Sequence, residues 1–304
     1  MALYLGIDVG ATWTRALLAD GSGRAHNRIK VRTGPNPVAE ISEAVASWSF
    51  EAVGVGSIGP LDVRKGWVTN APNSPSRQFP LVEPLKRFGR PVAVANDCVA
   101  AVWGEYTFGG WGVDNIAYLT LSTGLGVGAV VNGHLLLGKE GNAHELGHAV
   151  IDIKSDVKCG CGGVGHWEGL ASGANIPRHF KIFAERAGFK PPDVKTSEEV
   201  FRLYREGDRA AQAFIDYWIE VNAAGIAVIT AAYDPEVLVV GGSIALNHWD
   251  IFKAVEDKLR KYTPLTPPAI EKAKFGDDEV AIGAVALVVN VPDTLRKFGY
   301  PRVP

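Results

Sequence analysis

The sequence LYLGIDVGATWTRALLAD at residues 3–20 consists of two apolar runs separated by a short turn that contains Gly10. Runs of this length, rich in aliphatic side chains and bounded by turn residues, are typical of β-strands. The turn Asp20-Gly21-Ser22-Gly23 and a third such run follow. The first part of the chain is therefore predicted to contain, in order, strands over 3–9, 14–19 and 25–31, a helix over 37–49 and a buried strand over 52–57. Strands that alternate with helices indicate an α/β fold with a covered sheet.

This pattern repeats in the second part of the chain. A strand over 91–95 and a helix over 96–106 complete the first unit, and the glycine-rich residues 108–112 form a candidate domain boundary. From residue 115 onward the predicted elements are strands over 116–121, 127–131, 134–137 and 149–153, helices around 172–188, 196–206 and 208–232, a buried strand over 237–240 and a last helix over 278–290. The sequence therefore predicts two βββ-αβ-αβ units in tandem.

The composition excludes several classes of protein. With 304 residues, 47% hydrophobic and 21% charged, the chain is long enough for two domains with well-buried cores. A formal net charge of -2 and a pI of about 6.4 leave no basic excess for a nucleic-acid partner. Apolar stretches such as 282–291 are shorter than the roughly 20 residues that span a membrane. No signal peptide opens the chain and its three cysteines are too few for a disulfide framework, so we expect a cytoplasmic protein.

Three glycine-containing turns are candidate phosphate sites. The first is Asp8-Val9-Gly10-Ala11-Thr12, where glycine lets backbone N–H groups approach a phosphate and the Asp8 carboxylate can hold a hydrated Mg²⁺. The second, Ser122-Thr123-Gly124-Leu125-Gly126, has the same character at the start of the second unit. The third, Gly241-Gly242-Ser243, lies between a strand and a helix and suits adenosine or phosphate. The alternative for the first turn is an ordinary hairpin turn, and for the third an ordinary tight strand-to-helix turn.

The second turn could be mistaken for a dinucleotide-binding fingerprint, because a strand precedes its glycines. That fingerprint requires a helix after the glycines, whereas residues 127–131 are predicted to form a strand. A Rossmann site is therefore rejected. Two similar turns in duplicated units instead suggest that a phosphate chain is gripped from both domains.

Two further motifs allow alternative interpretations. Asn96-Asp97 lies between a buried strand and a helix start, so Asp97 either projects into a cleft or caps the helix. The string His144-Glu145-Leu146-Gly147-His148 matches the H-E-x-x-H signature of zinc peptidases, but that motif needs a helix, which the nearby glycines disfavour. A polar loop in which Glu145 and His148 bond sugar hydroxyls is the simpler interpretation.

A glycine-rich knuckle follows this loop. Cys159, Cys161 and His166 supply three soft or borderline ligands, and His148, eleven residues before the first cysteine, could complete a tetrahedral zinc site. The alternative is a loop without metal.

Taken in order, these motifs resemble the ROK family of sugar kinases and repressors, within the actin-like ATPase superfamily, and the resemblance runs from Leu3 to about Asn290. The family's DxGGT turn is matched with alanine at its second glycine, and its zinc knuckle is matched with His166 in place of the third cysteine. The other matching segments are the NxPN motif at 70–73, the ND pair at 96–97, the second phosphate turn at 123–126 and the ExGH motif at 145–148. Only seven residues precede Asp8, which favours the kinase branch over the DNA-binding repressors.

The resemblance implies two actin-like (ribonuclease H-like) domains around a central cleft. The expected domains are a smaller one at 1–112, onto which the C-terminal region at about 278–304 packs back, and a larger one at 113–277. The resemblance also implies site residues: Asp97 as catalytic base; Asn73, Asn96, Asp97, Glu145, His148 and Glu168 around the sugar; Asp8, Gly10, Ala11, Thr12, Thr123, Gly124, Gly126, Gly241 and Gly242 around ATP; and His148, Cys159, Cys161 and His166 around structural zinc.

The expected activity is transfer of the ATP γ-phosphoryl group, with Mg²⁺, to the 6-hydroxyl of a hexose, chiefly glucose. Fructose, mannose or an N-acetylated amino sugar remain alternative acceptors. A zinc metallopeptidase and a non-catalytic sugar sensor remain alternatives of other classes. The expected partners are hexose and ATP, with neither nucleic acid nor membrane, and a homodimer remains open.

Overall fold

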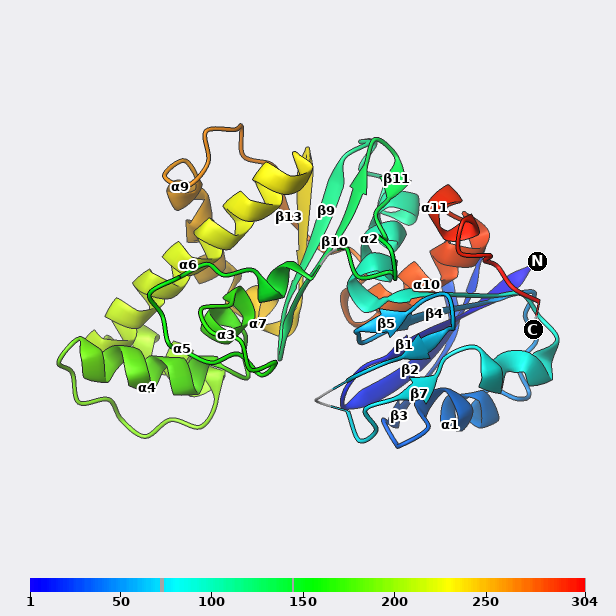
Figure 1. Ribbon diagram of the computed structural model, residues 1–304, viewed down its shortest axis with the longest axis horizontal. Coiled ribbons are helices and arrows are strands. Elements are labelled where there is room, and N and C mark those ends of the chain that lie inside the picture. The colour runs from blue at the N-terminus through cyan, green and yellow to red at the C-terminus, as the bar shows by residue number, and fades with distance from the viewer. Residues whose placement is uncertain (72–73, 144, 304) are drawn as a thin grey trace. The chain divides into compact units, whose positions relative to one another are not determined.

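The computed structural model describes residues 1–71, 74–143 and 145–303 as a mixed α/β chain that forms two compact units (Figure 1). The first unit comprises Met1–Tyr118, Gly128–His144 and Ala273–Pro304, and the second comprises Leu119–Val127 and Glu145–Lys272. The prediction of an α/β fold built from two domains is thereby confirmed. The predicted central cleft stays a prediction.

The first unit is built on a five-stranded sheet in the order β3-β2-β1-β4-β8. Its strands are β1 (Leu3–Val9), β2 (Trp13–Asp20), β3 (Ala25–Arg32), β4 (Val53–Ser57) and β8 (Val92–Asn96). β1 is antiparallel to β2 and parallel to β4, which is parallel to β8. The register pairs Val9 with Ser57 and Ser57 with Asn96, so the carboxyl ends of three strands meet at one edge. This edge carries Asp8 and Asp97.

The second sheet repeats this arrangement in the order β11-β10-β9-β12-β13. Its strands are β9 (Ile116–Leu121), β10 (Leu125–Val131), β11 (His134–Leu135), β12 (Val237–Gly241) and β13 (Ala269–Lys272). In both sheets the third, second, first, fourth and fifth strands in chain order lie side by side, which confirms the predicted duplication. The sequence analysis missed β13, a strand with only one buried residue and no clear alternation.

Helices α2 (Asp97–Phe108) and α10 (Glu279–Val289) pack together in the first unit, and α10 also packs on β1 and β4. Two glycines make this close approach sterically feasible. A β-carbon on Gly54 would collide with the backbone of Ala284 in α10, and one on Gly283 would collide with the backbone of Ala100 in α2. These contacts bring the C-terminal region of the chain into the first unit.

In the second unit the long helix α6 (Arg209–Tyr233) packs against helices α3 (Trp167–Ala171), α4 (Ile176–Arg186), α5 (Ser197–Arg205) and α9 (Glu256–Leu259) (Figure 1). By length and composition alone α6 could cross a membrane, and it is the one such helix in the described part of the chain. Its apolar side chains are used otherwise here: Phe214, Trp218 and Ile226 are fully buried in the unit. Packing in the protein core therefore accounts for its hydropathy.

The remaining elements are short. They are α1 (Pro37–Ala44), α7 (Ser243–Asn247), α8 (Trp249–Phe252), α11 (Asp293–Arg296), the 3₁₀ helices η1 (Glu83–Phe88), η2 (Leu146–His148), η3 (Lys253–Val255) and η4 (Gly276–Asp278), and the strands β5 (Leu61–Asp62), β6 (Trp67–Val68) and β7 (Phe79–Pro80). Strands β5, β6 and β7 form a small antiparallel sheet that the sequence analysis did not predict, because two-residue strands leave no periodic signal.

Two segments differ from expectation. The strand predicted over 149–153 is wrong: only the isolated bridge between Val150 and His166 forms there. Residues 128–143 pack with the first unit, since Gly128 lies against the backbone of Cys98 and the Leu135 carbonyl accepts a hydrogen bond from Thr294. The sequence-based domain boundaries at 112/113 and 277/278 stay a prediction.

A buried pair of carboxyl groups, Glu105 on α2 and Glu279 at the start of α10, should make stability depend on pH. Burial, followed by the charge of Glu105, raises the pKa of Glu279 well above 4.5, and Oε1 of Glu279 has no hydrogen-bond partner among the described residues. Because the folded state keeps a proton that the unfolded chain loses, stability should fall as pH rises from about 4.5 through the folded-state pKa.

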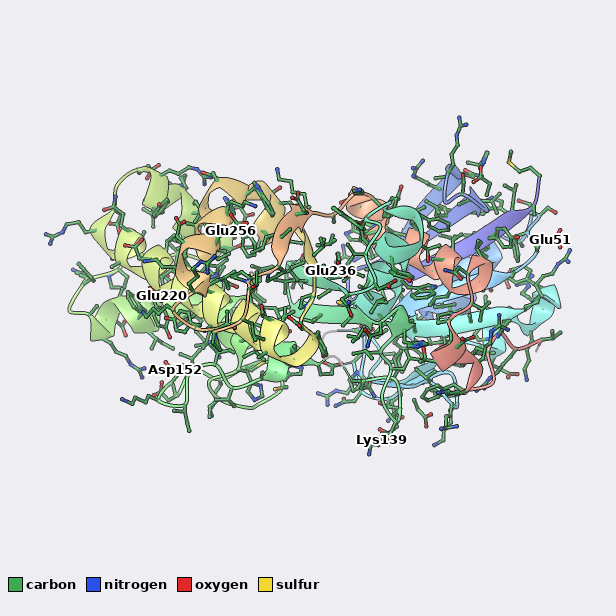
Figure 2. All side chains as sticks on the ribbon, turned by 90° about the horizontal axis from the view of Figure 1, so that it is seen from above. Glu51, Lys139, Asp152, Glu220, Glu236 and Glu256 are labelled. Atoms are coloured by element: carbon green, nitrogen blue, oxygen red, sulfur yellow. The ribbon has the colours of Figure 1, made fainter. Side chains whose placement is uncertain are left out.

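Glu279→Gln retains an N–H donor without a titrating group, so it should raise Tm at pH 8 by roughly 2–4 °C, the shift that about 1 kcal/mol produces in a large domain. Melting curves at pH 5 and pH 8 measure the effect, which should shrink at pH 5. Glu51→Gln is the matched control, because Glu51 lies on the surface of the same unit (Figure 2). Equal Tm changes for the two variants would contradict a raised pKa of Glu279 in the folded state.

Candidate functional site

The first glycine turn joins β1 to β2, and the residue that follows β3 is hydrogen-bonded to it. Gly10 donates its N–H to the Trp13 carbonyl at 3.0 Å, which closes the turn. Thr33 at the end of β3 donates its hydroxyl to the Gly10 carbonyl at 2.8 Å and its N–H to Thr12 at 3.0 Å. The backbone around Ala11 is thereby fixed. Sequence reasoning missed Thr33, because its role depends on strand pairing across more than twenty residues.

Asp8 lies at the end of β1, where it is 6% exposed and forms an ion pair with Arg15 at 3.0 Å. Burial raises the pKa of Asp8 to about 7; the Arg15 charge opposes this shift and the neighbouring Asp97 carboxylate adds to it. Asp8 and Asp97 are two acidic groups at one sheet edge, and a divalent cation there would offset their mutual repulsion.

The sequence left two roles open for Asp97: capping the helix or projecting into a cleft. Asn96 takes the first of these roles. Asn96 ends β8 and caps α2, since its side-chain oxygen accepts the Cys98 N–H at 2.9 Å. Asp97 is the first residue of α2, and one of its oxygens also accepts from Cys98 at 2.8 Å. The helix start therefore fixes the orientation of the Asp97 carboxylate, which stays partly exposed.

The second and third glycine turns come together in the second unit. The Ser122 N–H donates to the Gly124 carbonyl at 2.9 Å, and the Ser122 and Ser243 hydroxyls lie 3.3 Å apart. Gly242, with φ of 89°, sits so close to Leu121 that a β-carbon there would collide with its backbone. Thr123, Gly124, Gly126, Gly241 and Gly242, predicted at distant positions in the sequence, thus belong to one local region.

Glu168 links the second turn to the cysteine knuckle. Its carboxylate accepts the Leu125 N–H at 3.1 Å and the Cys159 thiol at 3.3 Å, while α3 holds its backbone. A β-carbon on Gly124 would lie 3.1 Å from the Glu168 carboxylate. The turn and the carboxylate are therefore in direct steric contact.

This contact gives a prediction for Gly124→Ala. The added methyl group faces Glu168 and leaves the backbone N–H of residue 124 in place, so KM for the hexose should rise several-fold while KM for ATP changes less. Steady-state kinetics with each substrate varied in turn measure both constants. Gly21→Ala, where a β-carbon would meet only ordinary contact distance, is the control. An unchanged KM for the hexose would contradict the expected position of Glu168 beside the sugar.

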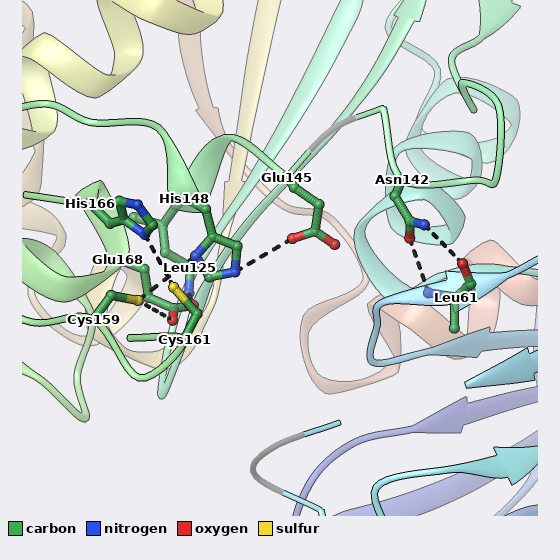
Figure 3. Close-up of polar contacts among 9 residues, drawn as sticks. All are labelled: Leu61, Leu125, Asn142, Glu145, His148, Cys159, Cys161, His166 and Glu168. Atoms are coloured by element: carbon green, nitrogen blue, oxygen red, sulfur yellow. Dashed lines mark hydrogen bonds and ion pairs between the residues drawn. The ribbon is translucent and has the colours of Figure 1, made fainter. Parts of the chain in front are cut away.

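The four predicted metal ligands form a cluster within the second unit (Figure 3). The ligand atoms of His148, Cys159, Cys161 and His166 all lie within 4.8 Å of one another. Nδ1 of His148 lies 3.8 Å from the Cys159 sulfur, and Nδ1 of His166 lies 3.2 Å from the Cys161 sulfur. Two thiols and two imidazoles at such separations fit a tetrahedral ion, so a candidate Cys₂His₂ metal site is present.

The protonation of the cluster responds to its surroundings. Burial raises the pKa of the Cys159 thiol to about 12. Burial, then the charge of His148, lowers the pKa of His166, so that imidazole favours the neutral, metal-ligating form.

His148 has a different partner on each ring nitrogen. Nδ1 faces the cysteines, while Nε2 lies 3.8 Å from the Glu145 carboxylate (Figure 3). Desolvation raises the pKa of Glu145, an effect that the nearby His148 opposes. Only a 3₁₀ turn, η2, forms over Leu146–His148, and no α-helix places Glu145 and His148 as a peptidase requires. The zinc-peptidase interpretation therefore lacks its structural context; its first histidine, at position 144, lies outside the described residues.

The described site residues are distributed over both units. The first unit holds Asp8, Gly10, Ala11, Thr12, Asn96 and Asp97; the second holds Thr123, Gly124, Gly126, Glu145, His148, Cys159, Cys161, His166, Glu168, Gly241 and Gly242. Asn73 lies outside the described residues. Sequence reasoning also missed Asn142, whose side-chain amide exchanges two hydrogen bonds with the Leu61 backbone, at 3.0 and 2.8 Å (Figure 3). That pair anchors the segment before Glu145 in the first unit.

Comparison with known proteins agrees with these features. The model of the ROK family matches residues 4–291. The chain is 62% identical over 303 residues to a glucokinase of Pyrobaculum calidifontis, with 99% of this chain and 100% of the relative covered. It is 38% identical to a glucokinase of Aeropyrum pernix, with 98% and 100% covered.

Among solved structures, a ROK family glucokinase from Streptomyces griseus in complex with glucose and AMPPNP is similar, with a TM-score of 0.77 and 31% identity over 94% of this chain and 99% of that one. The resemblance inferred from the motifs is thereby confirmed: the chain belongs to the ROK family.

Proposed function

We propose that this protein is an ATP-dependent glucokinase that transfers the γ-phosphoryl group to the 6-hydroxyl of glucose. The observation that carries the proposal is the carboxylate of Asp97, held at the start of α2 at the sheet edge that also carries the Asp8 turn. The similarity to glucokinases over the full length of the chain supports glucose as the acceptor.

Asp97 is the proposed catalytic base. It accepts the proton of the sugar hydroxyl as that oxygen attacks the γ-phosphorus in line with the departing ADP oxygen. Its hydrogen bond from the Cys98 N–H orients the carboxylate so that no reorientation is needed during transfer. Positioning and charge neutralisation supply most of the rate enhancement in phosphoryl transfer, so the base needs only modest strength.

Glu145, His148 and Glu168 in the second unit, with Asn96 and Asn73, are the proposed partners of the sugar hydroxyls. Nε2 of His148 and the Glu145 carboxylate lie 3.8 Å apart, a separation that a hydroxyl of the ligand can bridge. A sugar lacking one of those hydroxyls would leave polar groups unpaired, which is the physical basis of discrimination.

ATP is proposed to bind at the glycine turns. The backbone N–H groups around Ala11 and Gly124 would approach its phosphates, and Gly241-Gly242 in the neighbouring turn would contact its nucleoside part. Mg²⁺, held with water at Asp8, would supply charge neutralisation for the phosphate oxygens. Zinc is the ion proposed for the Cys₂His₂ cluster, where it acts as a structural brace.

A coupled assay tests the proposal. Oxidation of glucose 6-phosphate by a 6-phosphate-specific dehydrogenase reports the position of transfer, and ADP release reports turnover with mannose, fructose, N-acetylglucosamine and N-acetylmannosamine. Glucose should give the highest kcat/KM. ADP release that no sugar accelerates would refute the kinase and favour a non-catalytic sensor, whereas a higher kcat/KM for another sugar would refute only the choice of acceptor.

A further inference from the structure

A cavity of about 330 Å³ lies entirely within the second unit, between the loop after His148 and helices α4 and α6. We call it the α4–α6 pocket. Its polar and aromatic lining consists of Asp152, Lys154, His179, Phe183, Arg186 and Tyr217. None of these residues has a role in the proposed reaction, and the volume falls within the range of about 300–1,000 Å³ that small-ligand sites occupy.

His179 places an unused hydrogen-bond acceptor on this pocket. The side chain is only 4% exposed, and Nδ1 lies 2.7 Å from the carbonyl of Leu170. A carbonyl can only accept, so Nδ1 carries the hydrogen. Burial lowers the pKa of His179, which keeps the ring neutral and leaves a lone pair on Nε2. That atom has no hydrogen-bond partner among the residues the structure describes, so it can accept a hydrogen bond from a ligand.

Asp152 supplies a second hydrogen-bond acceptor beside the rings of Phe183 and Tyr217, which we call the aromatic wall. Its carboxylate accepts the Tyr217 hydroxyl at 3.2 Å and the Lys154 N–H at 2.9 Å, and two oxygens can accept further bonds. The Tyr217 ring stacks on Phe183 at 5.2 Å and meets the His179 ring edge-on at 5.5 Å. The pocket therefore combines apolar ring surface with acceptors that require donors from a ligand.

The charges around the pocket balance. Nη2 of Arg186 lies 2.6 and 2.7 Å from the two carboxylate oxygens of Asp156, so a negative charge lies beside this guanidinium. Lys154 and Asp152 are the other charged groups of the lining, and they have opposite signs. A strongly charged ligand would find little net attraction here, whereas a neutral ligand with several hydroxyl donors satisfies both acceptors.

We propose that the α4–α6 pocket is a second binding site for a neutral monosaccharide such as glucose. Hydroxyls of the sugar donate to Nε2 of His179 and to the Asp152 carboxylate, while a C–H face of the ring lies on the aromatic wall. The loop that forms the pocket is tied to the metal cluster. The Asp152 N–H donates to the Gly165 carbonyl at 3.3 Å and the Val157 carbonyl accepts the Gly165 N–H at 3.1 Å, directly before His166.

The test follows the ring ¹⁵N signals of the histidines while D-glucose is added without nucleotide. The Nε2 signal of His179, assigned by its loss in His179→Phe, should shift toward the position of a hydrogen-bonded acceptor and saturate. Ala187→Trp should abolish this shift, because Ala187 lines the pocket from an exposed position and an indole there fills it without disturbing the core. Lys181→Trp, on an exposed position of the same helix outside the lining, is the matched control and should keep the shift.

Three outcomes would overturn the proposal: a His179 signal that stays unmoved at saturating glucose, a shift that persists in Ala187→Trp, or a shift that disappears in Glu145→Ala, which would show that the substrate site causes it. The proposed kinase activity is judged separately by turnover. Ala187→Trp should keep kcat within about twofold, and a chain without turnover but with a responsive His179 would refute the kinase alone.

Discussion

Asp97→Asn is expected to lower kcat for glucose by roughly 10²- to 10⁴-fold, the range that a positioned general base contributes. Asparagine keeps the size of the side chain and an oxygen that can accept the Cys98 N–H, as the Asp97 carboxylate does at 2.8 Å. It cannot accept a proton from the sugar. The loss should therefore fall on kcat, while the hexose dissociation constant changes by less than about threefold.

Single-turnover phosphorylation and equilibrium binding of glucose separate the two quantities. Asp293→Asn is the control, because Asp293 lies in the same unit with 79% of its side chain exposed. Near-normal turnover in Asp97→Asn would remove Asp97 from the mechanism. A loss that appears equally in binding would make it a sugar ligand and leave the base to be found elsewhere.

Much of the fold could be predicted because its signals are local. At residues 3–20, the apolar runs predict two strands, and the short glycine turn between them predicts that they pair. The same pattern after residue 115 indicates the duplication. Helix α5 has a complete capping box, Thr196 with Glu199, and its predicted range of 196–206 agrees with the observed Ser197–Arg205 within one residue at each end. Such features need no knowledge of distant residues.

What could not be predicted depends on contacts between distant residues. The strand expected over 149–153 has the right composition, yet its partner is a knuckle loop that offers one bridge, at His166, and no neighbouring strand. The roles of Gly54 and Gly283 could not be predicted, because they depend on the packing of α10 against β4 and α2. The motifs indicated candidate site residues, but strand register was needed to place Asp8 and Asp97 at one edge of the sheet.

The Cys₂His₂ cluster was predicted from the spacing of its residues, and its geometry allows the effect of removing the two cysteine ligands to be predicted. Cys159→Ser with Cys161→Ser should reduce bound zinc from about one equivalent to none, since a hydroxyl is a poor zinc ligand. His148 would then lose the ion that fixes its Nδ1, and Glu168 would lose the thiol at 3.3 Å. KM for the hexose should rise roughly tenfold or more, which corresponds to about 1.4 kcal/mol of lost orientation.

The same double variant should melt several degrees lower, because metal binding to the folded state alone stabilises it. KM for ATP should change less, since Gly10 and its turn belong to the first unit. Elemental analysis of protein purified without a polyhistidine tag measures the bound zinc. Cys98→Ala is the control: Cys98 is the remaining cysteine of the chain and belongs to the first unit, so this variant should retain the zinc. Wild-type protein without zinc, together with an unchanged hexose KM in the double variant, would show that hydrogen bonds such as Cys159 to Glu168 hold the knuckle without an ion.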